Sequence, residues 1–219
     1  PARGRGGWAA PEPAVAPNPG NTTPARETPS PGDAPRRAAV ELKRALEGRT
    51  LRDLEGVNFH AEYTGITDKL GSPKEHPVSH IAYGYATHLV ELDEEGRISR
   101  VVAAHDVGRA VNPINVEGQI EGGVVMSLGY ALTEDLPLED GRPTVTYAGL
   151  GLFRAHQTPN VEALIIQKPD SVLACGAKGI GEICSIPTPP AVQNAYYNFD
   201  GRFRTSLPLE DTPYSRKKK

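Results

Sequence analysis

A run of glycines immediately before an acidic residue is the first feature of this 219-residue sequence that could do chemistry. The segment GAKGIGE, residues 176–182, places three glycines in six positions ahead of Glu182. Such a loop exposes consecutive backbone N–H groups, which suit a phosphate or the polar heteroatoms of a cofactor. A P-loop requires Lys-Ser or Lys-Thr after its last glycine, whereas Lys178 lies inside this run and a carboxylate follows it. Nucleotide binding is therefore disfavoured, and a plain structural turn stays open as the alternative.

A glycine pair inside an expected helix is the second feature. The segment HDVGRAVNPINVEGQIEGGVVMSLGYAL, residues 105–132, passes from a strand end through a tight turn into a helix that carries Gln119, Gly122 and Gly123. Glycine costs about 1 kcal/mol relative to alanine inside a helix, so the pair needs a reason. One reason is the close approach of a ligand or another backbone. The other is crowding between helices, with Gln119 as an ordinary surface residue.

The remaining chemistry-bearing residues indicate no second site. The six histidines lack the short-range spacing of a metal site, so no metal bound by protein side chains is expected. His105 and Asp106 are adjacent on an expected strand and should face opposite sides, which argues against an acid–base pair. Cys175 and Cys184 form no disulfide framework, which favours a reducing cytoplasm.

Hydrophobic periodicity predicts the elements that must position these two segments. Asn112-Pro113 supplies a capping side chain and a proline for the first helical turn before the glycine pair. Mixed helices and strands without a regular βαβ rhythm indicate an α+β fold. The expected elements are a helix at 37–48, a strand at 57–63, an antiparallel hairpin at 80–106, a helix from Pro113 to about 132, strands at 143–147 and 161–168, and a helix at about 188–197.

Composition divides the chain into two parts. Residues 1–36 hold nine of the 21 prolines and almost no large aliphatic side chain, which predicts a disordered Pro/Gly-rich segment. Residues 37–219 have ordinary aliphatic content and should form the folded domain. The net charge of −3 leaves no electrostatic footprint for nucleic acid, and no apolar run approaches membrane-spanning length. Neither nucleic acid nor a membrane is expected as a partner.

Two ordered motifs together resemble a known family. The string DVGRAVNPINVEGQIEGG followed by GAKGIGE is similar to the C-terminal region of the molybdenum hydroxylases, the xanthine dehydrogenase and aldehyde oxidase group. The segments HPVSHIAYGYATHLVELDEEG and FRTSLPLEDTPYSRK most resemble the selenium-dependent xanthine dehydrogenases. The likeness runs from about residue 38 to the end. It implies that residues 37–219 are the C-terminal portion of a molybdopterin-binding domain.

The resemblance implies a role for each motif residue. Glu182, which ends the Gly-rich motif, corresponds to the catalytic base of the family. Gln119 corresponds to a glutamine beside the cofactor, and many members carry a second glutamine where this chain has Met126. Because the pterin dithiolene holds molybdenum in this family, no protein side chain need ligate the metal. The positions implied to contact molybdopterin are Gln119, Gly122, Gly123, Lys178, Gly179, Ile180 and Gly181.

The implied activity is oxidative hydroxylation of a carbon beside nitrogen in an N-heterocycle such as a purine. The cofactor is molybdopterin with a labile sulfur or selenium ligand, while iron–sulfur clusters and FAD are expected on other domains or subunits. The partners are therefore the remainder of the molybdenum subunit and the iron–sulfur and flavin modules. The isolated chain is expected to be inactive, since small-ligand sites bury most of their ligand and this fragment supplies one side.

A non-catalytic orphan module, from a truncated gene or one with a misassigned start, is the alternative. The coding sequence immediately upstream distinguishes this module from an enzyme fragment. An in-frame continuation that encodes the remaining molybdenum-binding domain favours the enzyme.

Overall fold

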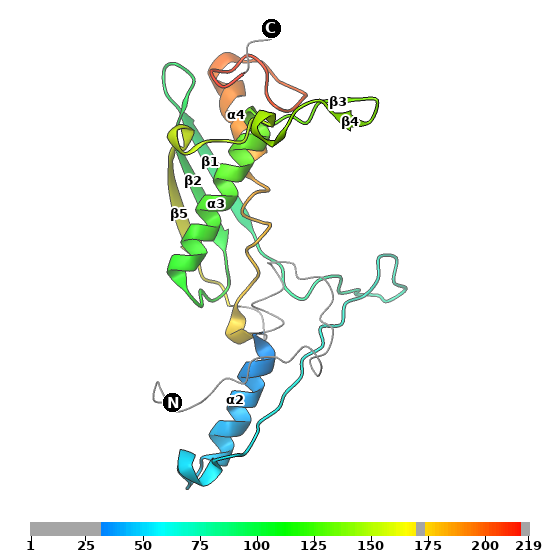
Figure 1. The fold of residues 1–219 in the computed structure, drawn as a ribbon, viewed down its shortest axis with the longest axis vertical. Coiled ribbons are helices and arrows are strands. Elements are labelled where there is room, and N and C mark those ends of the chain that lie inside the picture. Colours follow the sequence, from blue (N-terminus) through cyan, green and yellow to red (C-terminus); the bar gives the residue numbers. More distant parts are fainter. Residues whose placement is uncertain (1–31, 170–173, 216–219) are drawn as a thin grey trace. The chain divides into compact units, whose positions relative to one another are not determined.

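The computed structural model describes residues 32–169 and 174–215, and the chain divides into two units between Ile81 and Ala82 (Figure 1). The first unit contains helix α2 (Asp33–Ala45) and the short 3₁₀ turn η1 (Leu51–Leu54). The second contains a three-stranded sheet, two helices and a two-stranded hairpin. Mixed helices and strands confirm the predicted α+β class.

Helix α2 begins at Asp33, four residues before the predicted start at residue 37. The buried carboxylate of Asp33 accepts hydrogen bonds from the Nε atoms of Arg36 and Arg37, both at 2.6 Å. These two arginines lie one helical turn further on, so charge pairing extends the helix into the segment expected to be disordered. The prediction for residues 1–31 lies outside the described residues.

The predicted strand at 57–63 is wrong. Residues 57–69 form no strand in the structure, although apolar and polar side chains alternate along 57–63. Alternation produces a strand only when a neighbouring strand accepts its backbone groups. The chain instead forms an extended connection, which folds back at Asp68, whose N–H donates to the Val78 carbonyl at 2.7 Å.

The sheet of the second unit consists of β1 (Ala86–Leu92), β2 (Ile98–Asp106) and β5 (Asn160–Ile166), in the order β1-β2-β5. Strands β1 and β2 form the predicted antiparallel hairpin. Strand β5 confirms the strand predicted at 161–168 and pairs with β2 in parallel. The parallel pairing places the carboxyl ends of β2 and β5 at the same edge of the sheet.

Helices α3 (Pro113–Leu132) and α4 (Thr188–Asp200) cover one face of this sheet (Figure 1). Both were predicted, and the Asn112 side chain caps α3 by accepting a hydrogen bond from the Asn115 N–H at 3.3 Å. The fully buried residues that join the sheet to the helices are Val101, Ala103, Ile120, Val124, Leu128 and Val192. Within the described residues, no helix is long and apolar enough to cross a membrane.

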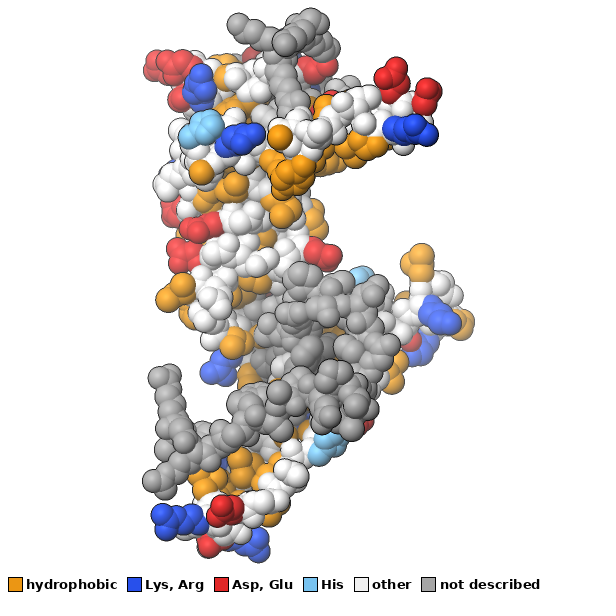
Figure 2. Space-filling view, viewed as in Figure 1, with side chains coloured by type: hydrophobic (Ala, Val, Ile, Leu, Met, Phe, Trp, Pro, Cys, Tyr) orange, Lys and Arg blue, Asp and Glu red, His pale blue; other side chains and the backbone are white. Residues whose placement is uncertain are grey.

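The strand predicted at 143–147 is also wrong. Strands β3 (Leu138–Glu139) and β4 (Arg142–Pro143) form a hairpin of two residues on each side. Both turn residues between them, Asp140 and Gly141, have positive φ, as a tight two-residue turn requires. Hydrophobic side chains gather along the lower edge of the arm that Figure 1 labels β3 and β4, as Figure 2 shows. Leu138 in β3 and Leu136 just before it are exposed.

Candidate cofactor site at the end of the sheet

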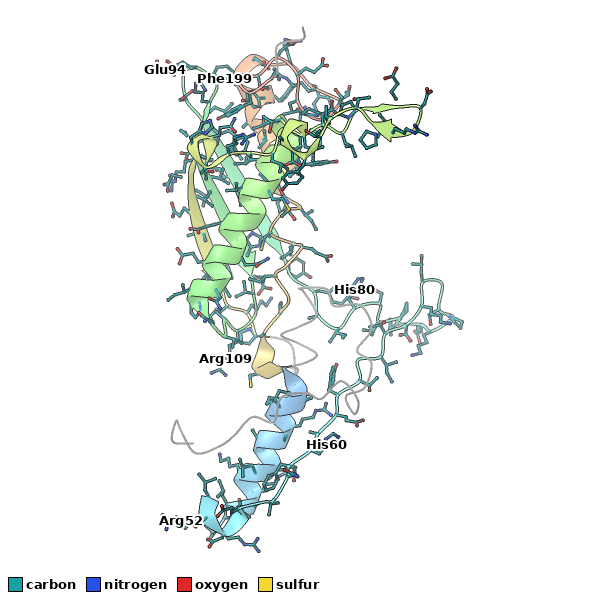
Figure 3. All side chains as sticks on the ribbon, viewed as in Figure 1. Arg52, His60, His80, Glu94, Arg109 and Phe199 are labelled. Atoms are coloured by element: carbon teal, nitrogen blue, oxygen red, sulfur yellow. The ribbon has the colours of Figure 1, made fainter. Side chains whose placement is uncertain are left out.

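The Gly-rich loop joins the sheet where strand β2 ends. The Lys178 N–H donates to the Val107 carbonyl at 3.0 Å, and the Arg109 N–H donates to the Gly176 carbonyl at 2.9 Å. Gly108 lies between these bonds with φ +61°, and a Cβ there would collide with the Gly176 carbonyl oxygen. Only glycine therefore fits where the chain turns from β2 towards α3. Figure 3 places Arg109 at the opposite end of the unit from Glu94 and Phe199.

A buried ion pair ties the two segments together through their side chains. The Lys178 Nζ lies 2.6 Å from the Asp106 Oδ2, and the two side chains are 1% and 9% exposed. The other oxygen, Asp106 Oδ1, accepts a hydrogen bond from the Gly108 N–H at 3.0 Å. Burial raises the pKa of Asp106, but the hydrogen bonds from Lys178 and Gly108 outweigh burial and hold the pKa below its usual range.

The loop beyond Lys178 presents backbone N–H groups that no described residue engages. The N–H groups of residues 179–182 have no hydrogen-bond partner within the described part of the chain. Carbonyl groups of the same stretch are used: the Cys184 thiol donates to the Ile180 carbonyl at 2.7 Å, and Ser185 donates to that of Glu182. Burial raises the pKa of the Cys184 thiol to about 11, so it keeps the donated proton at neutral pH. The side chain of Glu182 is exposed.

Gly122 and Gly123 lie in different surroundings on helix α3. A Cβ on Gly123 would lie 2.5 Å from the Cys184 Cβ and 2.9 Å from its carbonyl carbon, so this glycine allows the loop to pack on α3. A Cβ on Gly122 would meet nothing within 4 Å. Gln119, Gly122 and Met126 are all exposed and follow at helical i, i+3, i+7 spacing. They form one exposed stripe along α3.

The structure therefore brings the two sequence motifs into one region. Cys184, two residues after Glu182, lies on Gly123, while Lys178 is held at the end of β2. The Gly-rich loop thus runs from the edge of the sheet to helix α3. Close approach of another backbone was one of the reasons offered for the glycine pair, and Gly123 has it, but the partner Cys184 and the ion pair of Asp106 were not foreseen from the sequence. The sequence signal that could have indicated a role for Asp106 is its position at the end of an expected strand, just before the Val107-Gly108 turn.

A second polar cluster is buried between the sheet and α4. The Nε2 atoms of His88 and His105 are 2.7 Å apart, and the His88 Nδ1 lies 2.9 Å from the Thr188 Oγ1. The side chain of Asp106 instead engages Lys178, which confirms that His105 and Asp106 point to opposite sides of the strand. Among the described residues, no group of three or more His, Cys, Asp or Glu is placed to hold a metal ion.

This histidine pair is expected to make folding stability fall in mild acid. Burial, with the nearby His105, lowers the pKa of His88 from 6.5 to about 4. Between these two values the unfolded chain binds a proton that the folded chain does not, so stability is lost as pH falls below 6.5. We expect the free energy of unfolding to drop by about 1 kcal/mol between pH 7.5 and pH 5, less than the full pKa shift allows, because His88 is only half-buried and water screens its charge. Urea titrations should show a smaller drop for His88→Gln, and an equal drop would contradict this assignment.

Comparison with known proteins gives a family and a fold. The family model described as "Molybdopterin cofactor-binding domain" matches residues 42–159, which include Gln119, Gly122 and Gly123 and end before the Gly-rich loop. The nicotine 6-hydroxylase large subunit of Paenarthrobacter nicotinovorans is 36% identical over 49% of this chain and 14% of its own length. The xanthine dehydrogenase molybdenum-binding subunit of Escherichia coli O157:H7 is 30% identical over 51% of this chain and 15% of its own.

The chain spans about one seventh of the length of these curated relatives. Among solved structures, the aldehyde oxidoreductase of Desulfovibrio gigas has the same fold, with a TM-score of 0.66 over 88% of this chain and 23% of its own. Its sequence is 24% identical.

Proposed function

Since the chain belongs to the molybdopterin cofactor-binding domain family, we propose that residues 37–219 form the C-terminal portion of this domain in the catalytic subunit of a molybdenum hydroxylase. The observation that carries the proposal is the Gly-rich loop, whose N–H groups at residues 179–182 are unengaged by described residues and precede the exposed carboxylate of Glu182. The loop is anchored at the sheet edge and on α3, so it offers a fixed set of donors.

The donor set fits a pterin that carries a phosphate. Backbone N–H groups at Gly179, Ile180 and Gly181 suit anionic or carbonyl oxygens. The amide of Gln119 adds a side chain that both donates and accepts, and Gly122 leaves open space beside it. We propose that these residues hold the cofactor. Lys178 contributes differently, because its N–H is bonded to Val107 and its side chain to Asp106.

Glu182 is proposed as the general base. When bound, molybdopterin supplies the molybdenum that carries out oxygen transfer and accepts electrons. The carboxylate of Glu182 would take up the proton released when the substrate carbon is hydroxylated. The exposed carboxylate of Glu182 is accessible to a substrate, as a general base must be. The neighbouring carbonyl of Glu182 is fixed by Ser185, which limits movement of the loop.

The substrate class we propose is an N-heterocycle such as a purine. Two of the relatives are named for nicotine and xanthine, both ring-nitrogen compounds. We further propose a labile sulfur or selenium ligand, as in the selenium-dependent xanthine dehydrogenases, and electron transfer through iron–sulfur and flavin modules in the cytoplasm. The family match favours this enzyme over a non-catalytic module.

The test is metal and pterin analysis of the full-length subunit with Gln119→Ala. We expect molybdopterin retention to weaken about fivefold, equivalent to ~1 kcal/mol for one lost hydrogen bond. Glu117→Ala is the matched control, because Glu117 is exposed on the same helix but lies on the opposite side from Gln119. A wild-type subunit without molybdenum would overturn the function. If Gln119→Ala and Glu117→Ala have equal molybdenum content, Gln119 does not contact the cofactor.

A further inference from the structure

We propose that the buried Asp106–Lys178 ion pair positions the cofactor loop: it fixes residues 179–182 relative to the sheet and thereby orients their N–H groups and Glu182. Asp106 and Lys178 are positioning residues and touch neither cofactor nor substrate. The inference rests on the proposed function and assigns the Lys178 side chain a role that differs from cofactor contact.

The geometry of the pair supports this role. The two residues are 72 positions apart in sequence, so their contact at 2.6 Å fixes one segment on the other. Asp106 also holds the following turn, because its Oδ1 accepts the Gly108 N–H. The Asp106 N–H donates to the Tyr85 carbonyl at 2.8 Å, and the Tyr85 ring centroid lies 6.0 Å from the Lys178 Nζ. Strand end, turn and loop are thus joined at one point.

The burial of the pair argues against a purely stabilising role. Removing two charges from water is costly, and replacing buried ion pairs by apolar residues is often neutral or stabilising. A matched contrast joins the same strand β2 to β5, where Arg100 pairs with Glu162 and the two side chains are 40% and 43% exposed. The exposed pair can separate into water at little cost, whereas separating Lys178 from Asp106 would break an ion pair inside the protein. A buried pair therefore specifies where the loop lies.

The burial also argues against Lys178 as a direct anion ligand. Its side chain is 1% exposed and its ammonium is paired with a carboxylate. A phosphate would have to displace Asp106 to reach it. The lysine thus leaves anion binding to the N–H groups that follow it in the loop.

The first measurement is amide hydrogen exchange on the 219-residue chain. Asp106→Asn should accelerate exchange at least tenfold at the Gly108, Arg109 and Lys178 amides, which are hydrogen-bonded around the pair. Glu162→Gln, which breaks the exposed pair between Arg100 of β2 and Glu162 of β5, should leave these amides unchanged. Wild-type exchange at the three amides in Asp106→Asn would overturn the proposal.

The second measurement separates positioning from stability in the full-length subunit. The double variant with Asp106→Asn and Lys178→Met removes both buried charges, so its Tm should recover towards wild type from that of Asp106→Asn. We expect its kcat, or its molybdopterin content, to stay at least tenfold low despite this recovery. If Tm and kcat both recover, the pair is only structural and the proposal fails. If the wild-type subunit lacks molybdenum, the proposed function is wrong. The hydrogen-exchange measurement would still show whether the Asp106–Lys178 pair fixes the loop.

Discussion

Glu182→Gln in the full-length subunit is expected to lower turnover by ~10²–10⁴-fold, the scale for removal of a general base. Glutamine is nearly isosteric with glutamate, but its amide cannot accept the proton that a carboxylate takes. The N–H groups of the loop remain, because the substitution changes no backbone atom. Molybdenum and pterin content should therefore match wild type while kcat collapses.

The control for this experiment is Glu139→Gln, an exposed carboxylate in the β3–β4 hairpin. It should leave kcat unchanged. An alternative role for Glu182, as a carboxylate that favours a helix dipole, predicts only a small change in stability of roughly 0.3–1 kcal/mol. The structure does not favour that role, because helix α4 begins six positions later at Thr188. A metal-replete Glu182→Gln enzyme with turnover within about threefold of wild type would end the assignment.

Gly123→Ala is expected to destabilise the packing of the Gly-rich loop on α3. The new Cβ would lie 2.5 Å from the Cys184 Cβ and 2.9 Å from its carbonyl carbon, so backbone must move. Overpacking of this kind costs about 1–3 kcal/mol. The gain in helix propensity from glycine to alanine, about 1 kcal/mol, offsets only part of it. Urea unfolding of the 219-residue chain should show a net loss of stability.

The neighbouring Gly122→Ala provides the control, since its Cβ would meet nothing within 4 Å. It should stabilise the chain by about 0.5–1 kcal/mol through helix propensity alone. In the full-length subunit the same substitution should lower molybdopterin content, because the methyl would enter the space that we assign to the cofactor. Stabilisation by both alanines would contradict the packing of Cys184 on Gly123. Unchanged cofactor content in Gly122→Ala would show that Gly122 does not line the cofactor site.

The sequence by itself determined the elements whose signals are local. Asn112-Pro113 starts α3 because a capping side chain and a preset proline act within one helical turn. The β1–β2 hairpin was predictable because its two strands are joined by one short turn. Helix α4 begins at Thr188, as predicted. The two motifs, GQIEGG and GAKGIGE, also identified the resemblance to the family that the comparison then showed.

Only the tertiary structure decided the features that depend on distant residues. Alternating side chains at 57–63 and 143–147 formed no full strand, because strand formation requires a partner that local sequence does not specify. The parallel register of β5 on β2 likewise depends on a connection of more than fifty residues.

The site shows the same division. Types and order of residues identified Glu182, Gln119 and the glycines as candidates, because backbone freedom and donor chemistry are properties of each residue. Only the tertiary structure showed that Gly123 packs against Cys184 and that Lys178 pairs with Asp106. Neither pairing could be read from spacing, since the residues are 61 and 72 positions apart and a fold alone brings them within contact distance.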